Sequence, residues 1–251
     1  MLSLRPVRIL VVSACALVAG HVIALVLRQG WDVDENLGLV RQFDLNGEGN
    51  LAAWFASFVL ANCALAALVI GIVKRLDGER LGARWTAFAA FVLLMAVDET
   101  AQLHDMATGP TRRALNVDWG VDFGVLYFAW IVPALLVLAG AVLYFRPLLG
   151  SVAAGVRAHL VIAVLVYFGG AVGFEMISGS VAAGGRRTTS YLAVITVEET
   201  LELVGALLVL TALLRQLAAM RPQLLVRWTG DAPELLRAVD ATKSTATDHP
   251  A

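Results

Sequence analysis

Carboxylates inside apolar stretches are the residues of this sequence that could carry chemistry. Asp98 and Glu99 directly follow a run of apolar or small residues at 86–97, and Glu198 lies beyond the apolar segment YLAVITV. A charged side chain at the centre of a membrane helix costs about 2.5–3.5 kcal/mol even on a lenient insertion scale. These residues therefore predict a polar interior site, in which a bound cation or protons offset the repulsion between carboxylates.

Helical geometry indicates that the first group of acids could line one side of a helix. At about 100° per residue, Asp98, Gln102 and Asp105 occupy one face. Glu99 lies at the edge of this face, and His104 points elsewhere. A simpler interpretation stays open: if the helix completes its membrane crossing before these acids, they form an ordinary solvated helix end.

A second helix offers a matching acidic face. Glu198 and Glu202 are four residues apart and share a face, with Glu199 at its edge. Glu175 and His21 belong to two further apolar stretches. In the topology derived below, all of these groups fall in the outer half of the membrane, so several helices could turn them towards a common interior.

A divalent metal ion is the cofactor that this residue set favours. Carboxylates with one or two histidines suit Mn, Fe, Zn, Mg or Ca, and the sequence does not select among them. His21 could instead be a packed hydrogen-bonding group, and His104 an interface residue. The candidate metal ligands are Asp98, Glu99, Asp105, Glu175, Glu198, Glu199, Glu202, His21 and His104.

Three functions are compatible with such a site. The first is a divalent-cation site, either catalytic or transporting. The second is a small proton-coupled transporter that uses the carboxylates as a relay. The third is a non-catalytic assembly partner for another membrane protein or for a second copy of this chain. A membrane hydrolase acting on lipid or on an outer-leaflet substrate is a further possibility, but no Gly-x-Ser-x-Gly or His-Glu-x-x-His motif supports it, and the sequence has no Glu-x-x-His pair of the di-iron type. No catalytic residue is therefore assigned, and whether the protein is an enzyme stays open.

The segment DLNGEGN at 44–50 resembles the start of a calcium-binding EF-hand loop. Asp44, Asn46 and Glu48 alternate as ligands would, but Phe55 stands where the loop needs a bidentate glutamate. We favour a turn with Asn50 as the cap of the next helix, and calcium binding by this loop stays open.

The composition predicts the elements that must position these side chains. The chain is 59% hydrophobic and 16% charged, with a mean hydropathy of +0.77, whereas soluble domains are about 25% charged. Together with a net charge of −1, this composition favours the lipid bilayer over nucleic acid as the partner. We expect an all-α, polytopic bundle of six transmembrane helices, at about 9–27, 51–73, 85–106, 121–145, 159–180 and 190–215.

The placement of arginine and lysine predicts the orientation of the bundle. With six spans and a cytoplasmic N-terminus, 13 basic residues fall on the inner side and six on the outer side. Both termini are then cytoplasmic, and 14 of the 20 acids fall in outer loops or outer helix halves. We predict a multi-pass protein of the bacterial inner membrane, with a domain at 1–220 and a tail at 221–251 that holds a short helix before a disordered end.

Two local features bear on helix packing. Pro133 lies near the middle of the fourth predicted span, where it should kink the helix. Gly169 and Gly173 are four residues apart in the fifth span, which predicts a face of small residues for close helix contact.

Three segments together resemble a family of uncharacterised bacterial multi-pass membrane proteins. They are FDLNGEGNLAAWFAS, AVDETAQLHD and VEETLELVG, and the similarity covers about 40–210. The family pattern has an acidic loop before a tryptophan, here Trp54, an Asp-Glu pair before a His-acid pair, and a Glu-Glu-x-x-Glu segment. Asp105 stands where that pattern has glutamate. The resemblance implies a membrane protein and no particular chemistry.

Overall fold

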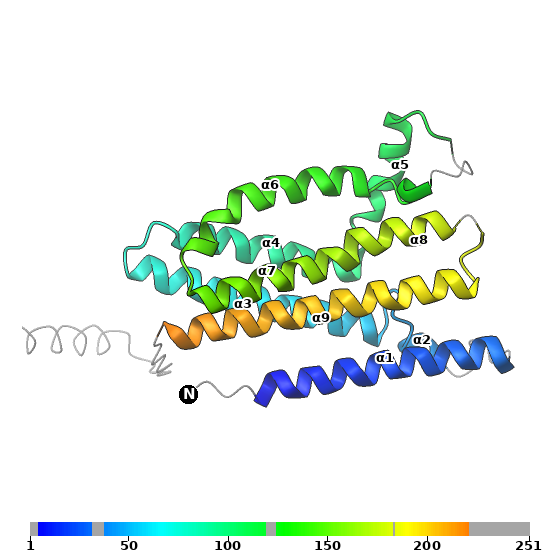
Figure 1. Cartoon of the computed structure of the whole chain (residues 1–251), viewed down its shortest axis with the longest axis horizontal. Helices are drawn as coiled ribbons and strands as arrows, with labels where there is room; N and C mark the ends of the chain where they lie inside the picture. Colours follow the sequence, from blue (N-terminus) through cyan, green and yellow to red (C-terminus); the bar gives the residue numbers. More distant parts are fainter. Residues whose placement is uncertain (1–4, 32–37, 119–123, 183, 221–251) are drawn as a thin grey trace, which may run out of the picture. The chain divides into compact units, whose positions relative to one another are not determined.

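The computed structural model describes residues 5–31, 38–118, 124–182 and 184–220. This part of the chain is all-α, as predicted, and its long helices run side by side (Figure 1). Residues 1–220 form one compact unit. The predicted tail at 221–251 lies outside the described residues.

The helices follow one another with short connections. They are α1 (Arg5–Trp31), α2 (Leu39–Gln42), α3 (Leu51–Leu76), α4 (Gly82–Ala101), α5 (Asp105–Ala114), η1 (Gly124–Leu126), α6 (Ile131–Gly150), α7 (Ala154–Phe168), η2 (Gly169–Phe174), α8 (Glu175–Ala182) and α9 (Thr189–Ala219). The segment η1 is a 3-10 helix, and η2 is a π-helical stretch that joins α7 to α8.

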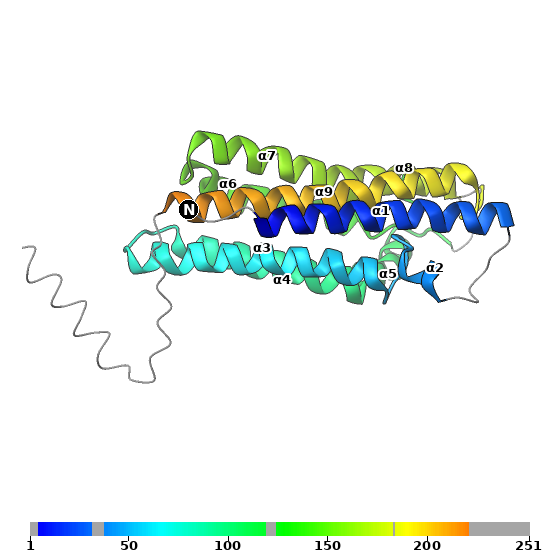
Figure 2. The same ribbon diagram turned by 90° about the horizontal axis from the view of Figure 1, so that it is seen from below.

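Helix α9 holds the bundle together, because it packs against α1, α3, α7 and α8. Figures 1 and 2 show it running alongside these helices. Helices α3 and α4 form an antiparallel hairpin, whereas α6 touches only the neighbouring α4 and α5 among its main contacts. The apolar face of α6, with Leu136 and Leu143 more than 70% exposed, is suited to contact with lipid.

Small residues allow the helices of the hairpin to approach closely. A side chain at Gly71 would lie 2.9 Å from the backbone nitrogen of Thr86, so only glycine fits there. Gly78 has φ +75°, a conformation that glycine adopts without strain, and it turns the chain from α3 into α4. Val59, Cys63 and Ile70 are fully buried between the helices.

Among the described residues, four helices are candidate membrane spans by length and composition, or five if one bent pair of helices counts as a single span. The four that are long and apolar enough are Val7–Gln29, Leu51–Leu76, Ile131–Gly150 and Ala154–Ala182. Helices α4 and α5 qualify only together and are bent by 91° relative to each other. Helix α9, at the sixth predicted span, is not among these candidates, and its first half carries three glutamates.

Several predicted details were wrong. The span predicted at 85–106 ends at Ala101, where Gln102 adopts a left-handed conformation with φ 46°. The span predicted at 121–145 begins as a helix only at Ile131, so Pro133 lies in the first helical turn, where its missing N–H is tolerated and no mid-helix kink results. Gly169 and Gly173 have open space where a side chain would lie and make no close helix contact.

Candidate functional site: an acidic cavity at one end of the bundle

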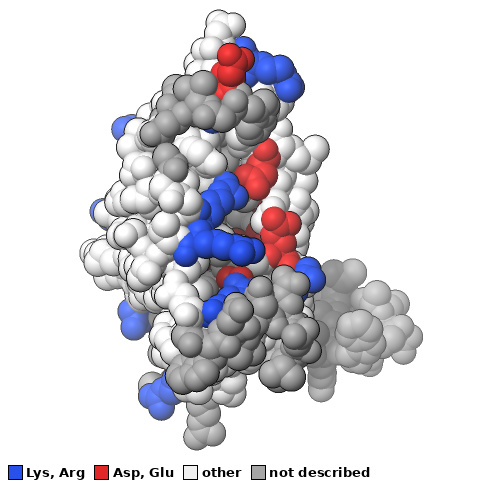
Figure 3. Space-filling model, turned by 90° about the vertical axis from the view of Figure 1, so that its right-hand side faces the viewer, with Lys and Arg blue, Asp and Glu red and all other residues white. Residues whose placement is uncertain are grey.

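A cavity of about 190 Å³ opens where α3, α4, α8 and α9 meet at one end of the bundle. Seven of the residues that line it carry carboxylates: Glu48, Glu99, Asp105, Glu175, Glu198, Glu199 and Glu202. Arg186 is the only arginine or lysine among its described lining residues, and His104 is the only histidine. Figure 3 shows this end of the molecule, where acidic and basic side chains lie side by side. We call this space the acidic cavity.

Glu198 is the most buried acid of the cavity, with 3% of its surface exposed. Its carboxylate lies beside the carboxylate of Glu175 and the hydroxyl of Ser178. The atom Oε2 of Glu198 has no hydrogen-bond partner among the described residues. A buried carboxylate oxygen without a partner is costly, so this atom marks a place where a bound cation or a proton is needed.

The π-helical segment η2 packs closely against α9. A side chain at Gly170 would lie 2.8 Å from the carbonyl oxygen of Glu198 and 2.9 Å from Cγ of Glu202, so glycine is required for this contact. Single π-helical turns are frequent at functional sites. The glycine that allows close packing in this span is therefore Gly170, and not the predicted pair.

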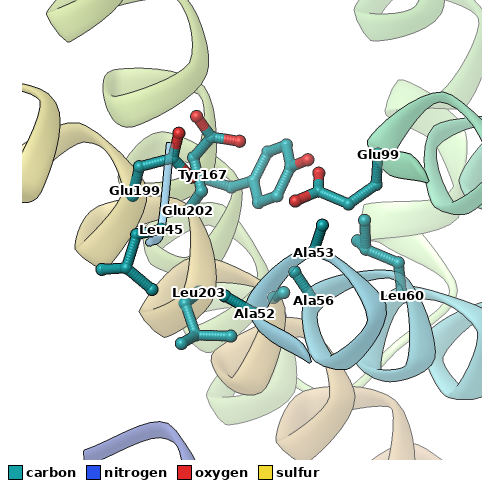
Figure 4. Close-up of a pocket in the computed structure, with 11 residues that line it drawn as sticks. Leu45, Ala52, Ala53, Ala56, Leu60, Glu99, Tyr167, Glu199, Glu202 and Leu203 are labelled. Carbon is teal, nitrogen blue, oxygen red and sulfur yellow. The ribbon is translucent and has the colours of Figure 1, made fainter. Parts of the chain in front are cut away.

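A smaller pocket of about 20 Å³, roughly the room for one water molecule, continues the cavity towards the middle of the bundle. Glu99, Glu199 and Glu202 line both spaces. Figure 4 shows the phenol ring of Tyr167 pointing towards the carboxylate of Glu99, with a floor of alanine and leucine side chains from α3 and α9. Tyr167 is 8% exposed, and sequence reasoning did not single it out.

The break between α4 and α5 brings His104 back to Asp98. The backbone N–H of His104 donates to Oδ1 of Asp98 (2.8 Å), and its ring Nδ1 lies 2.8 Å from Oδ2. This contact was not expected, because a continued helix would direct His104 away from the acids. The left-handed Gln102 reverses that direction and also ends the predicted common face of Asp98, Gln102 and Asp105.

His104 lies beyond the end of α4, among charged and aromatic neighbours. Its ring lies against that of Trp130, with centroids 4.5 Å apart and the planes tilted by 51°, and the indole nitrogen of Trp130 donates to Glu175 (3.2 Å). Burial alone would lower the pKa of His104. The hydrogen bond and charge of Asp98, with the charges of Asp105 and Glu175, outweigh burial and raise that pKa above 6.5.

Arg186 is held at the cavity by aromatic rings. Its guanidinium carbon lies 4.9 Å from the ring centre of Phe128 and 5.7 Å from that of Tyr127. No ion pair among the described residues involves Arg186. The side chain is thus a cation resting on ring faces at the edge of an acidic space. Sequence reasoning counted it only as one of the outer basic residues.

His21 is not part of the acidic cavity lining. Its Nδ1 accepts the backbone N–H of Leu45 (3.1 Å), and its Nε2 lies 3.1 Å from the hydroxyl of Thr196. That hydroxyl donates to the carbonyl of Leu192, so Nε2 carries the proton. The ring of His21 on α1 therefore contacts the loop after α2 through Nδ1 and α9 through Nε2.

The segment that resembles an EF-hand loop forms a turn at the cavity rim. Asn50 caps α3 by accepting the backbone N–H of Ala53 (2.9 Å), as predicted, and its amide donates to the carbonyl of Asp44 (2.6 Å). The carboxylate of Asp44 pairs with Arg28 (2.9 Å). Asn46 and Glu48 line the acidic cavity instead of converging within the loop.

The nine candidate ligands do not form a preformed metal centre. Within the described residues, no group of three or more His, Cys, Asp or Glu side chains is placed to hold a metal ion. The acids instead surround a space much larger than one dehydrated ion. A metal ion that enters the cavity would therefore keep part of its hydration shell, as Mg²⁺ commonly does.

Comparison with known proteins assigns the chain to a family. Residues 9–217 match a domain of unknown function, DUF8692, and the chain belongs to this family. No curated protein and no solved structure matches the chain. The family and the apolar helices together define a multi-pass membrane protein with no activity attached to its fold.

Proposed function

We propose that this membrane protein binds a cation in the acidic cavity and that the cavity opens on the outer side of the membrane. The buried Glu198 carries the proposal, because this residue lines the cavity and its Oε2 is buried without a hydrogen-bond partner among the described residues. Seven carboxylates against one arginine leave the lining negative unless protons or a cation neutralise it.

The outward orientation rests on a proposed six-span topology in which α9 is the sixth span. Helix α9 is 31 residues long, about 46 Å at 1.5 Å per residue, which is enough to cross a bilayer. Its glutamates line the cavity, so they need not face lipid. The excess of basic residues in the inner loops supports the further proposal that both termini are cytoplasmic and that the protein lies in the inner membrane of a bacterial cell.

A divalent metal ion is the first cation to test, because carboxylate oxygens are hard ligands. The purified full-length protein, prepared without chelator, would be analysed for bound metals by elemental mass spectrometry and dialysed against Mg²⁺, Mn²⁺, Fe²⁺, Zn²⁺ and Ca²⁺. We expect binding that Glu198→Gln weakens at least tenfold. Asp77→Asn, which removes an exposed acid outside the cavity lining, should leave binding unchanged.

The metal version of the proposal fails if none of these ions binds the wild-type protein. Equal binding by the wild-type protein and Glu198→Gln would show instead that the ions occupy surface acids. Co-purification of a second membrane protein that covers the cavity would favour the assembly-partner alternative.

A proton-coupled small transporter is the second candidate. The inner pocket favours it, because Glu99, Glu199 and Glu202 extend the acidic lining inward to Tyr167. Uptake by proteoliposomes that follows an imposed proton gradient, and that Glu202→Gln abolishes, would distinguish transport from static binding.

A further inference from the structure

We infer that the cation held in the acidic cavity is an aliphatic diamine, a chain of methylene groups with a protonated amine at each end. The inference rests on the proposed function, because it names the class of cation for the same cavity. It is carried by the size of the cavity, the order of its acids and the apolar side chains within its lining.

The size of the cavity and the spread of its carboxylates fit an organic ligand. A bare metal ion needs several ligand atoms about one centre, and the described residues provide no such group. An ammonium group donates up to three hydrogen bonds and needs no closed coordination sphere. A ligand with two such groups can therefore satisfy carboxylates at both ends of a cavity of about 190 Å³.

The acids form two levels along α9. Glu198, beside Glu175, forms the outer level. Glu202, which with Glu99 also lines the inner pocket, forms the inner level. Four residues separate Glu198 from Glu202, which corresponds to about 6 Å along the helix. An extended chain of four methylene groups spans about this distance between its two nitrogens.

Apolar side chains form the smaller part of the cavity lining, beside the acids. Leu45, Ala53 and Ile195 belong to the same lining as the carboxylates. A hydrated metal ion gains nothing from these walls, whereas methylene groups are removed from water when they lie against them. The combination of two acidic levels and a few apolar lining residues matches a molecule that is cationic at its ends and apolar in its middle.

Two side chains already show the recognition chemistry. Arg186, itself a cation on an alkyl chain, rests on the rings of Phe128 and Tyr127 beside the acids. Arg186 thus resembles the proposed ligand, because both carry a positive charge at the end of an aliphatic chain. Glu198 lines the same cavity and is almost fully buried, and its Oε2 is an acceptor without a hydrogen-bond donor among the described residues.

The experiment measures binding by isothermal titration calorimetry to the full-length protein in detergent. The probes are ethane-1,2-diamine, butane-1,4-diamine, hexane-1,6-diamine and butylamine, with Mg²⁺ and Mn²⁺ alongside. We expect butane-1,4-diamine to bind at least tenfold more tightly than butylamine and more tightly than the shorter diamine. The length series needs only the wild-type protein, so misfolding of a variant cannot obscure it.

Variants then locate the site. Glu198→Gln and Glu202→Gln should each weaken diamine binding at least tenfold, and Asp77→Asn should not. Equal affinities for butylamine and all the diamines would overturn the inference. Binding of Mg²⁺ or Mn²⁺ without any binding of diamines would overturn it too, and would leave the proposed cation site standing. If no cation binds, both proposals fail.

Discussion

Gly205 on α9 meets the backbone of Tyr167 on α7 so closely that no side chain fits between them. A Cβ atom at Gly205 would lie 2.6 Å from the nitrogen, Cα and Cβ of Tyr167. This contact sets the position from which the phenol ring reaches the inner pocket beside Glu99. The distance between two helices thus determines where a polar group lies in the interior.

Gly205→Ala should therefore separate α7 from α9 locally. We expect a loss of about 1–3 kcal/mol in the free energy of unfolding, the usual effect of overfilling a packed interior. Gly140→Ala in α6 is the matched control, because open space surrounds that position. Thermal unfolding in detergent measures both. A Gly205→Ala protein as stable as the control would contradict the close contact.

Asn50 should be important for the rim of the cavity as well as for α3. Asn50→Ala removes the helix cap and the hydrogen bond to the carbonyl of Asp44, and we expect a loss of about 1–2 kcal/mol in stability. Asn62→Ala, which removes one exposed hydrogen bond within α3, should change stability by less than about 0.5 kcal/mol. Chemical unfolding followed by circular dichroism compares the two variants.

His104 should titrate above its ordinary range because of Asp98. Because the pKa of His104 is higher in the folded protein than in the unfolded chain, protonation of His104 stabilises the fold. This stabilisation is complete below pH about 6.5, the pKa of an unperturbed histidine, and is lost as the pH rises through the higher pKa of the folded state. Asp98→Asn should lower the pKa of His104, since it removes the paired charge. NMR titration of labelled histidines measures this, with His159 beside Arg215 as an internal reference. An unchanged pKa in Asp98→Asn would show that the pair does not form.

Arg186 should compete with any cation that enters the cavity. Arg186→Gln removes the only arginine or lysine side chain of the described lining. Because this change removes a positive charge that repels other cations, we expect cations to bind about three- to tenfold more tightly. Arg187→Gln, which changes an exposed neighbour outside the lining, should have a smaller effect. Titration calorimetry with Mg²⁺ and butane-1,4-diamine at fixed ionic strength makes the comparison. Weaker binding to Arg186→Gln would contradict this competition, because a guanidinium repels both of these cations.

The sequence predicts the helical class and most helix positions because long apolar runs are local signals. The same is true of the cap at Asn50, which depends on residues three positions apart. The return of His104 to Asp98 was not predictable in this way, because a single left-handed residue, Gln102, reverses the chain. Non-glycine residues adopt the left-handed conformation so rarely that it cannot be predicted from the residue type at this position.

The inner end of the site was missed for a different reason. Tyr167 and Glu99 belong to helices far apart in the sequence, and their approach depends on how closely α7 and α9 pack. Periodicity places a residue on a face of its own helix, but it does not fix the rotation of one helix against another. Arg186 was overlooked because a loop arginine beside a membrane usually signals topology alone.

The π-helical turn at 169–174 makes the site depend on chain length as well as on residue type. A π-helical turn contains one residue more than an α-helical turn, so it rotates everything that follows by about 100° relative to an uninterrupted helix. Glu175 comes directly after this turn. Deleting one residue from the segment would swing Glu175 away from Glu198 while leaving every lining residue in the sequence. Members of this family that share all seven acids but differ in the length of this segment would therefore differ in the site that those acids build.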